Sequence, residues 1–244
     1  MQTRLVLFTV GLIVAFVLSG CSKSSSSTPT SPATTQNSAP SFPSVVVAGP
    51  TTTSSDPHAT ETVAYATSLN AYTSSGIFAA FTGTNGTQNG NTWTWTVSEG
   101  TLSVTFNETK QSDGSYTWAW IENGSNSSSH VTYNNWTFFS GNRSADGKNG
   151  EWKVFNDNTT TLSGDFVWAT NASGTLTATL TAYNTSGVLT GKYIVTNNSD
   201  KSGEVDVYTG TVLVFKATWV AAGSGTWWAY DSNSGAQTGT GTWS

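Results

Sequence analysis

Acidic residues gather at two places in the sequence where carboxylates could act in pairs. One group is Asp200, Glu204 and Asp206, and the other is Asp157 and Asp165. Glycoside hydrolases need two carboxyl groups beside the bond they cleave, one as acid and one as base or nucleophile. A hydrolase that acts on carbohydrate outside the cell is therefore one hypothesis. Solvation of turns explains the same carboxylates equally well.

The two histidines do not form a metal-binding pattern. His58 and His130 stand in polar segments without a second His or Cys nearby, whereas zinc sites combine several such ligands at short spacings. Residues 231–235 are rich in Asp, Asn and Ser, as calcium loops are, but Gly235 is misplaced and the distal glutamate is missing. We therefore expect solvated surface histidines, no metal site and no cofactor.

Tryptophan is unusually abundant, with 11 residues in a chain of 244. Most tryptophans occupy alternate positions, which favours packing in the core of a sheet. A second interpretation is that some rings line a cavity or lie exposed on the sheet, where they bind an apolar or glycan ligand. The candidates are Trp227, Trp228, Trp118 and Trp168. Because Trp227 and Trp228 are neighbours, they must face opposite sides of a strand.

Strands must position these side chains, because apolar residues alternate with threonine and serine from Trp93 to Trp243. Short segments of Asn, Asp, Ser and Gly separate the repeats and favour tight turns. We predict about twelve strands in an antiparallel up-and-down meander. Several strands begin with glycine two residues before an aromatic ring, which we interpret as ring packing over glycine. These starts are at 150–152, 164–166, 191–193 and 225–227.

One helix precedes the strands. Asp56 can cap its first amides, and Pro57 suits the first helical position. Apolar residues then recur at spacings of three and four up to Tyr72, before Ser74 and the following residues stop the helix. We expect a helix over about 57–73. The predicted fold is mainly β: a meander that hides its apolar face by closing into a barrel or by curving strongly around this helix.

The composition excludes some partners. Charged residues make up only 9% of the chain, and the formal net charge is −5. The lysines and arginines are scattered and form no cluster that could neutralise phosphates, so we expect no nucleic-acid partner. A single cysteine, Cys21, allows no disulfide within the chain.

The first 20 residues read as a secretory signal: Arg4 is followed by an apolar run that ends at Leu18, Ser19 and Gly20. The sequence Leu18-Ser19-Gly20-Cys21 resembles the lipobox of bacterial lipoproteins. The resemblance implies that Cys21 is lipidated and becomes the first residue of the mature chain, anchored in a membrane. Ser22 and Lys23 follow, without the aspartate that commonly retains such lipoproteins in the inner membrane. The outer membrane of the bacterial envelope is therefore favoured.

The sequence predicts three segments: a signal peptide at 1–20, the lipidated cysteine and a Ser/Thr/Pro-rich disordered linker at 21–55, and one β-rich domain at 56–244. The segment Val45–Val47 has a second interpretation as a docked edge strand.

Three functions remain open. The first is a lipid-anchored envelope protein whose non-catalytic β-domain binds an apolar or glycan ligand or has a structural role. The second is the hydrolase, and the third is an integral outer-membrane β-barrel. The third is disfavoured because several predicted strands are shorter than the ~9–11 residues that a membrane-spanning strand needs, and because an integral barrel would not need a lipid anchor.

Overall fold

The computed structural model describes residues 45–70, 86–127 and 129–244, and these form a mainly β domain with one helix. The predicted signal peptide, Cys21 and most of the predicted linker lie outside the described residues. The last residues of the predicted helix, including Tyr72, also lie outside them.

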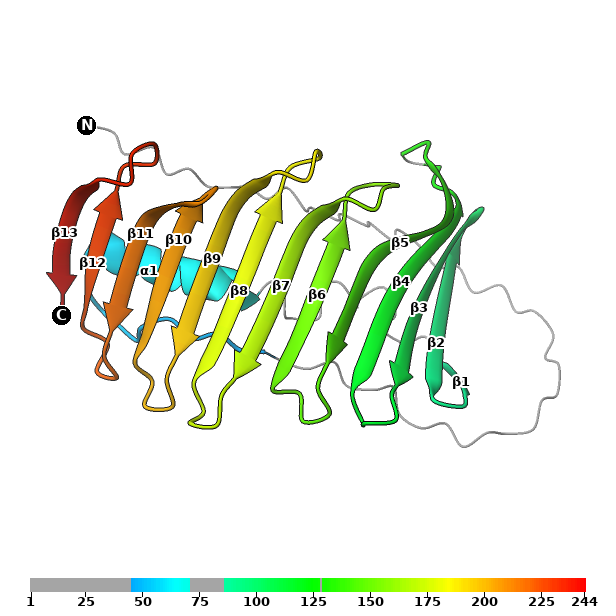
Figure 1. Ribbon diagram of the computed structural model, residues 1–244, viewed down its shortest axis with the longest axis horizontal. Coiled ribbons are helices and arrows are strands. Elements are labelled where there is room, and N and C mark those ends of the chain that lie inside the picture. Colours follow the sequence, from blue (N-terminus) through cyan, green and yellow to red (C-terminus); the bar gives the residue numbers. More distant parts are fainter. Residues whose placement is uncertain (1–44, 71–85, 128) are drawn as a thin grey trace. The chain divides into compact units, whose positions relative to one another are not determined.

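Thirteen antiparallel strands follow one another in chain order within one sheet of the described residues, which confirms the predicted meander (Figure 1). Their bounds are β1 (Thr87–Asn89), β2 (Thr92–Glu99), β3 (Leu102–Lys110), β4 (Tyr116–Ser125), β5 (Thr132–Arg143), β6 (Asn149–Phe155), β7 (Leu162–Thr170), β8 (Leu176–Tyr183), β9 (Leu189–Asn197), β10 (Gly203–Thr209), β11 (Val212–Trp219), β12 (Gly225–Tyr230) and β13 (Gln237–Trp243).

The strand that the sequence did not predict is β1. Its three residues are polar and exposed, so no apolar alternation marks it. Within the described sheet, β1 and β13 each pair with one neighbour only. Of the two predicted forms, the strongly curved open sheet is therefore the one found.

Alternation gives the sheet two different faces. The inner face carries the apolar residues, and the register places Trp152, Phe166 and Leu180 side by side on β6, β7 and β8. The outer face carries mainly threonine and charged residues, as at Thr179 and Lys216. Cross-strand neighbours of this kind lie close enough to pack, so each inner row adds to a continuous apolar core.

Three hairpins share a pairing of glycine with tryptophan across adjacent strands of the inner face. In each, a Cβ on the glycine would overlap the indole ring, and the indole N–H donates to a backbone carbonyl in the turn before the glycine. The pairs are Gly150 with Trp168, Gly203 with Trp219, and Gly225 with Trp243. The predicted packing of a ring over glycine is therefore confirmed at Gly150 and Gly225. At Gly164 and Gly191 the nearest atom is a backbone carbonyl oxygen, so the prediction is wrong there.

The helix α1 (Pro57–Ser68) starts at the predicted proline. The Asp56 carboxylate accepts hydrogen bonds from the amides of His58 and Ala59 at 2.8 and 3.4 Å, so it caps the first turn. The helix crosses the inner face near β9, β11 and β12, where Tyr65 contacts Tyr193 and Phe215 (Figure 1). It covers the C-terminal part of the sheet.

The segment 45–55 packs on the domain, although the sequence placed it in the linker. Val45 and Val47 are buried. The Asn70 side chain bonds both the N–H and the C=O of Val47, and Asn197 does the same for Ala48, all at 2.8 Å. The segment has no strand structure. Hydrogen bonds from side-chain amides and the burial of its valines attach it to the domain, and no backbone ladder of a sheet does so.

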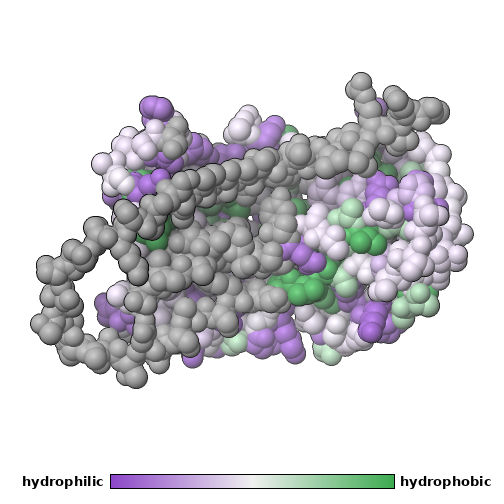
Figure 2. All heavy atoms as spheres, turned by 180° about the vertical axis from the view of Figure 1, so that it is seen from behind, coloured by the Kyte–Doolittle hydropathy of each residue, from purple (hydrophilic) through white to green (hydrophobic). Residues whose placement is uncertain are grey.

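From the helix side, hydrophobic side chains form patches between hydrophilic ones (Figure 2). No helix in the described part of the chain is long and apolar enough to cross a membrane.

Candidate ligand-binding site

Two of the four candidate tryptophans belong to the core. Trp118 and Trp168 are 3% and 1% exposed. Both rings pack edge-on against Trp152, at 6.2 and 5.6 Å between centroids. Rings buried in this way stabilise the inner face, and they offer no surface to a ligand.

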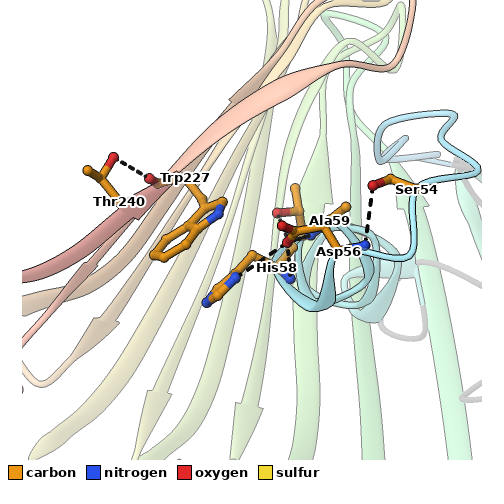
Figure 3. A network of polar contacts seen from close by, with 7 residues as sticks. Ser54, Asp56, His58, Ala59, Trp227 and Thr240 are labelled. Atoms are coloured by element: carbon orange, nitrogen blue, oxygen red, sulfur yellow. Dashed lines mark hydrogen bonds and ion pairs between the residues drawn. The ribbon is translucent and has the colours of Figure 1, made fainter. Parts of the chain in front are cut away.

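Trp227 also faces inward, where α1 covers it. The His58 ring stacks on Trp227 with centroids 3.5 Å apart, and His58 Nδ1 lies 3.4 Å from Asp56 (Figure 3). His58 therefore fixes the start of the helix on β12, and it is not the solvated surface histidine that the sequence suggested. His130, in contrast, is exposed.

Trp228 differs from the other three. It lies on the outer face, between Lys216 of β11 and Thr240 of β13. Its side chain is half-buried. Among the described residues it makes no ring contact, and its indole N–H reaches no acceptor. Part of its ring is therefore exposed, and its indole nitrogen is not among the buried unbonded ones, so both can reach a ligand.

The residues around Trp228 form two rows across β10–β13, which we call the outer patch. Each row runs at right angles to the strands and takes one residue from each strand. The first row is Glu204, Thr218, Thr226 and Thr242, and the second is Asp206, Lys216, Trp228 and Thr240.

The charges of the outer patch are paired within it. Lys216 Nζ lies 2.6 Å from Glu204 Oε1 and 3.2 Å from Asp206 Oδ1. Burial raises the pKa of Asp206, the Lys216 ammonium lowers it, and nearby Glu204 raises it further. This ion triad holds Lys216 beside Trp228, so the ring borders a fixed polar group.

A shallow hollow of about 310 Å³ adjoins the first row. It lies where β11 and β12 meet their connecting turn. Its lining is Thr218, Trp219, Val220, Ser224, Gly225, Thr226, Thr242 and Trp243. Thr218, Thr226 and Thr242 of the outer patch thus share this hollow with the inner-face residues Trp219 and Trp243, at the ends of the strands.

The acidic groups singled out in the sequence are brought together only in part. Glu204 and Asp206 meet at Lys216, whereas Asp200 bonds Ser202 in the turn before β10. Asp157 lies in the turn after β6 and accepts a hydrogen bond from the Tyr133 hydroxyl at 2.9 Å. Asp165 lies on the outer face of β7 opposite Lys153. These last two carboxylates do not form a pair.

Two buried carboxylates on the inner face were missed in the sequence. Glu108 and Glu122 are 1% and 3% exposed. Each occupies a position where the alternation of its strand calls for an apolar, inward-facing residue. Glu108 stands two residues after buried Phe106, and Glu122 stands two residues after buried Trp120. An acidic residue in the apolar phase of an alternating strand was the available signal.

Glu108 has an unusual environment. Burial raises its pKa from 4.5 to about 7, although the Trp118 indole and the Arg143 guanidinium oppose the shift. Arg143 Nη2 lies 3.9 Å from Glu108 Oε1, and both carboxylate oxygens are buried without a hydrogen bond of ordinary length. The carboxyl group is therefore poorly compensated when charged.

Glu122 is better satisfied. The Trp120 indole donates to its Oε1 at 3.2 Å. Burial nevertheless raises the pKa of Glu122, and the Asp157 carboxylate adds to the increase. Both inner glutamates thus favour the protonated form more than an exposed glutamate does.

Glu108 and Glu122 do not face each other. Glu122 pairs with Val104, which lies four residues before Glu108 on β3. At ~3.3 Å per residue, the two positions are ~13 Å apart along the strands. The carboxyl groups of glycosidases lie ~5–9.5 Å apart, so these two are not placed to act on one bond.

The described residues contain no group of three or more His, Cys, Asp or Glu side chains that could hold a metal ion. Comparison with known proteins finds no matching family model and no similar curated protein.

Proposed function

We propose that this protein is a lipid-anchored component of the bacterial envelope, with the outer membrane favoured, whose non-catalytic β-domain binds a glycan at the outer patch. Cys21 is the proposed anchor, since it ends the lipobox-like sequence. We infer that the part of the predicted linker before the packed segment 45–55 separates the domain from the membrane surface.

The observation that carries this proposal is the environment of Trp228. Its ring lies among hydroxyl and charged groups on the outer face, and among the described residues no aromatic ring or cation stacks on it and no acceptor bonds its N–H. A partly exposed indole with a free donor suits a ligand that has both apolar and hydroxyl-bearing sides. Sugar rings have this character.

A glycan fits the outer patch better than an apolar ligand does. Threonine and ionic side chains surround Trp228, so an apolar molecule would remove them from water without replacing their hydrogen bonds. Sugar hydroxyls can replace those hydrogen bonds. The hollow beside the first row adds room for part of such a ligand.

Binding is also favoured over hydrolysis. The inner glutamates are too far apart to share a bond, and Glu204 and Asp206 are both bound to Lys216. A catalytic pair needs one carboxyl group to donate a proton and the other to stay charged on opposite sides of one bond.

Binding of the mature protein to soluble polysaccharides, measured by affinity electrophoresis, tests the ligand class. We expect retardation by at least one glycan, and Trp228→Ala should weaken it about tenfold or more, because the stacked ring supplies most of the contact. Val167→Ala is the control, since Val167 is exposed on the same face outside the patch. Equal binding by both variants would refute the site.

The anchor is tested separately by fractionation of cells that express the Cys21→Ala variant. We expect this variant in the soluble fraction, because it lacks the site of acylation. A variant that still partitions wholly with membranes would contradict the lipid anchor.

A further inference from the structure

We propose that the ligand of the outer patch is a neutral, extended glycan chain that lies across β10–β13, at right angles to the strands. This inference rests on the proposed glycan-binding function and specifies the ligand and its direction.

The direction follows from the first row of the outer patch. Thr218, Thr226 and Thr242 are direct cross-strand partners on three consecutive strands. Neighbouring strands are ~4.8 Å apart, so the hydroxyls repeat at about that interval. That interval is close to the length of one sugar in an extended β-linked chain. No side chain or backbone group of the described residues bonds these three hydroxyls.

The second row places the aromatic ring for the same chain. Trp228 lies on β12, two residues from Thr226 on the same face. Two residues along a strand span ~6.8 Å, so the indole stands beside the hydroxyl row near its middle strand. A sugar that bonds Thr226 would therefore have Trp228 against its side.

The charge distribution indicates a neutral ligand. The only cation of the two rows, Lys216, lies within 3.2 Å of two carboxylates. An anionic sugar would meet both carboxylates, and a cationic one would compete with Lys216 for them. Hydrogen bonds to hydroxyls and contact with the indole remain available to an uncharged chain.

The hollow of about 310 Å³ extends the first row toward the turn between β11 and β12. Ser224 adds a fourth hydroxyl there, and Val220 is 53% exposed beside it. Together the row and the hollow span from β10 to β13, about three strand spacings or ~14 Å. We therefore expect three to four sugar units to be in contact.

Isothermal titration calorimetry of the full mature protein with β-1,4-linked glucose oligosaccharides of two to six units tests the inference. We expect affinity to rise about tenfold or more from two to four units and then stay constant, with little change between low and high salt. Thr226→Val, which removes only the hydroxyl, should weaken binding of the four-unit chain about fivefold. Thr179→Val on the outer face of β8 is the matched control and should have no effect.

The outcomes separate this inference from the proposed function. Glycan binding that depends on Trp228 but not on chain length, or that is stronger for anionic polymers, would overturn the inference and leave the proposed function standing. Failure of every glycan tested, with the fold intact, would overturn both.

Discussion

Replacement of Glu108 by glutamine should stabilise the protein, and the gain should depend on pH. The pKa of Glu108 rises from 4.5 to about 7 in the folded protein because its carboxyl group is buried. The folded state therefore binds a proton more tightly than the unfolded state does. It follows that the stability supplied by protonated Glu108 is fully present below about pH 4.5 and is lost as the pH rises to about 7.

The magnitude follows from the size of the shift. Each pKa unit corresponds to ~1.4 kcal/mol, so the change from 4.5 to about 7 costs on the order of 3 kcal/mol above pH 7. Glutamine is uncharged at every pH and has nearly the same shape. Glu108→Gln should therefore raise the free energy of unfolding by ~3 kcal/mol at pH 8 and by less than ~1 kcal/mol at pH 4.5.

Urea unfolding followed by tryptophan fluorescence at pH 4.5, 6 and 8 measures this difference. Glu99→Gln is the control, because Glu99 is exposed beside the turn between β2 and β3. If Glu108→Gln lowers stability at pH 8, the attraction between Glu108 and Arg143 outweighs the cost of burial, and the reasoning is wrong. An equal gain at pH 4.5 and pH 8 would also refute it.

Three further substitutions test the packing and the helix cap. Gly203→Ala should destabilise the fold by ~1–3 kcal/mol, because its Cβ would overlap the Trp219 ring; Gly164→Ala should change stability little, since the nearest atom to its Cβ would be 3.7 Å away. Thermal melts of both variants compare them, and equal melting temperatures would contradict the account. Asp56→Ala should cost ~1 kcal/mol through loss of the helix cap. Urea unfolding measures that loss, and an unchanged midpoint would show that the cap contributes nothing.

The sequence predicted the sheet because its alternation is long and regular. The same alternation places Trp227 and Trp228 on opposite faces. The cross-strand rows could not be predicted, since bulges shift the register after Val207 and Ala229. Each such shift depends on turn geometry that local composition does not determine.

Contacts between distant parts of the chain could not be predicted from the sequence either. The Asn197 side chain bonds Ala48, 149 residues earlier, so nothing local in the linker marks where packing begins. The pairing of glycine with tryptophan was hidden because the separation differs from one hairpin to the next, as between Gly203 and Gly225. The burial of Glu108 and Glu122 could have been predicted from the sequence, because both stand at positions where the alternation places inward-facing apolar residues.

The most direct test of the proposed glycan site is a titration followed by the indole N–H signals in proton–nitrogen NMR spectra. The 11 tryptophans give 11 such signals, and Trp228→Phe identifies the one from Trp228. We predict that an added β-1,4-linked glucose oligosaccharide shifts the Trp228 signal and leaves those of buried Trp118 and Trp168 in place. Binding that shifts the buried signals while the Trp228 signal stays fixed would contradict the outer patch as the site.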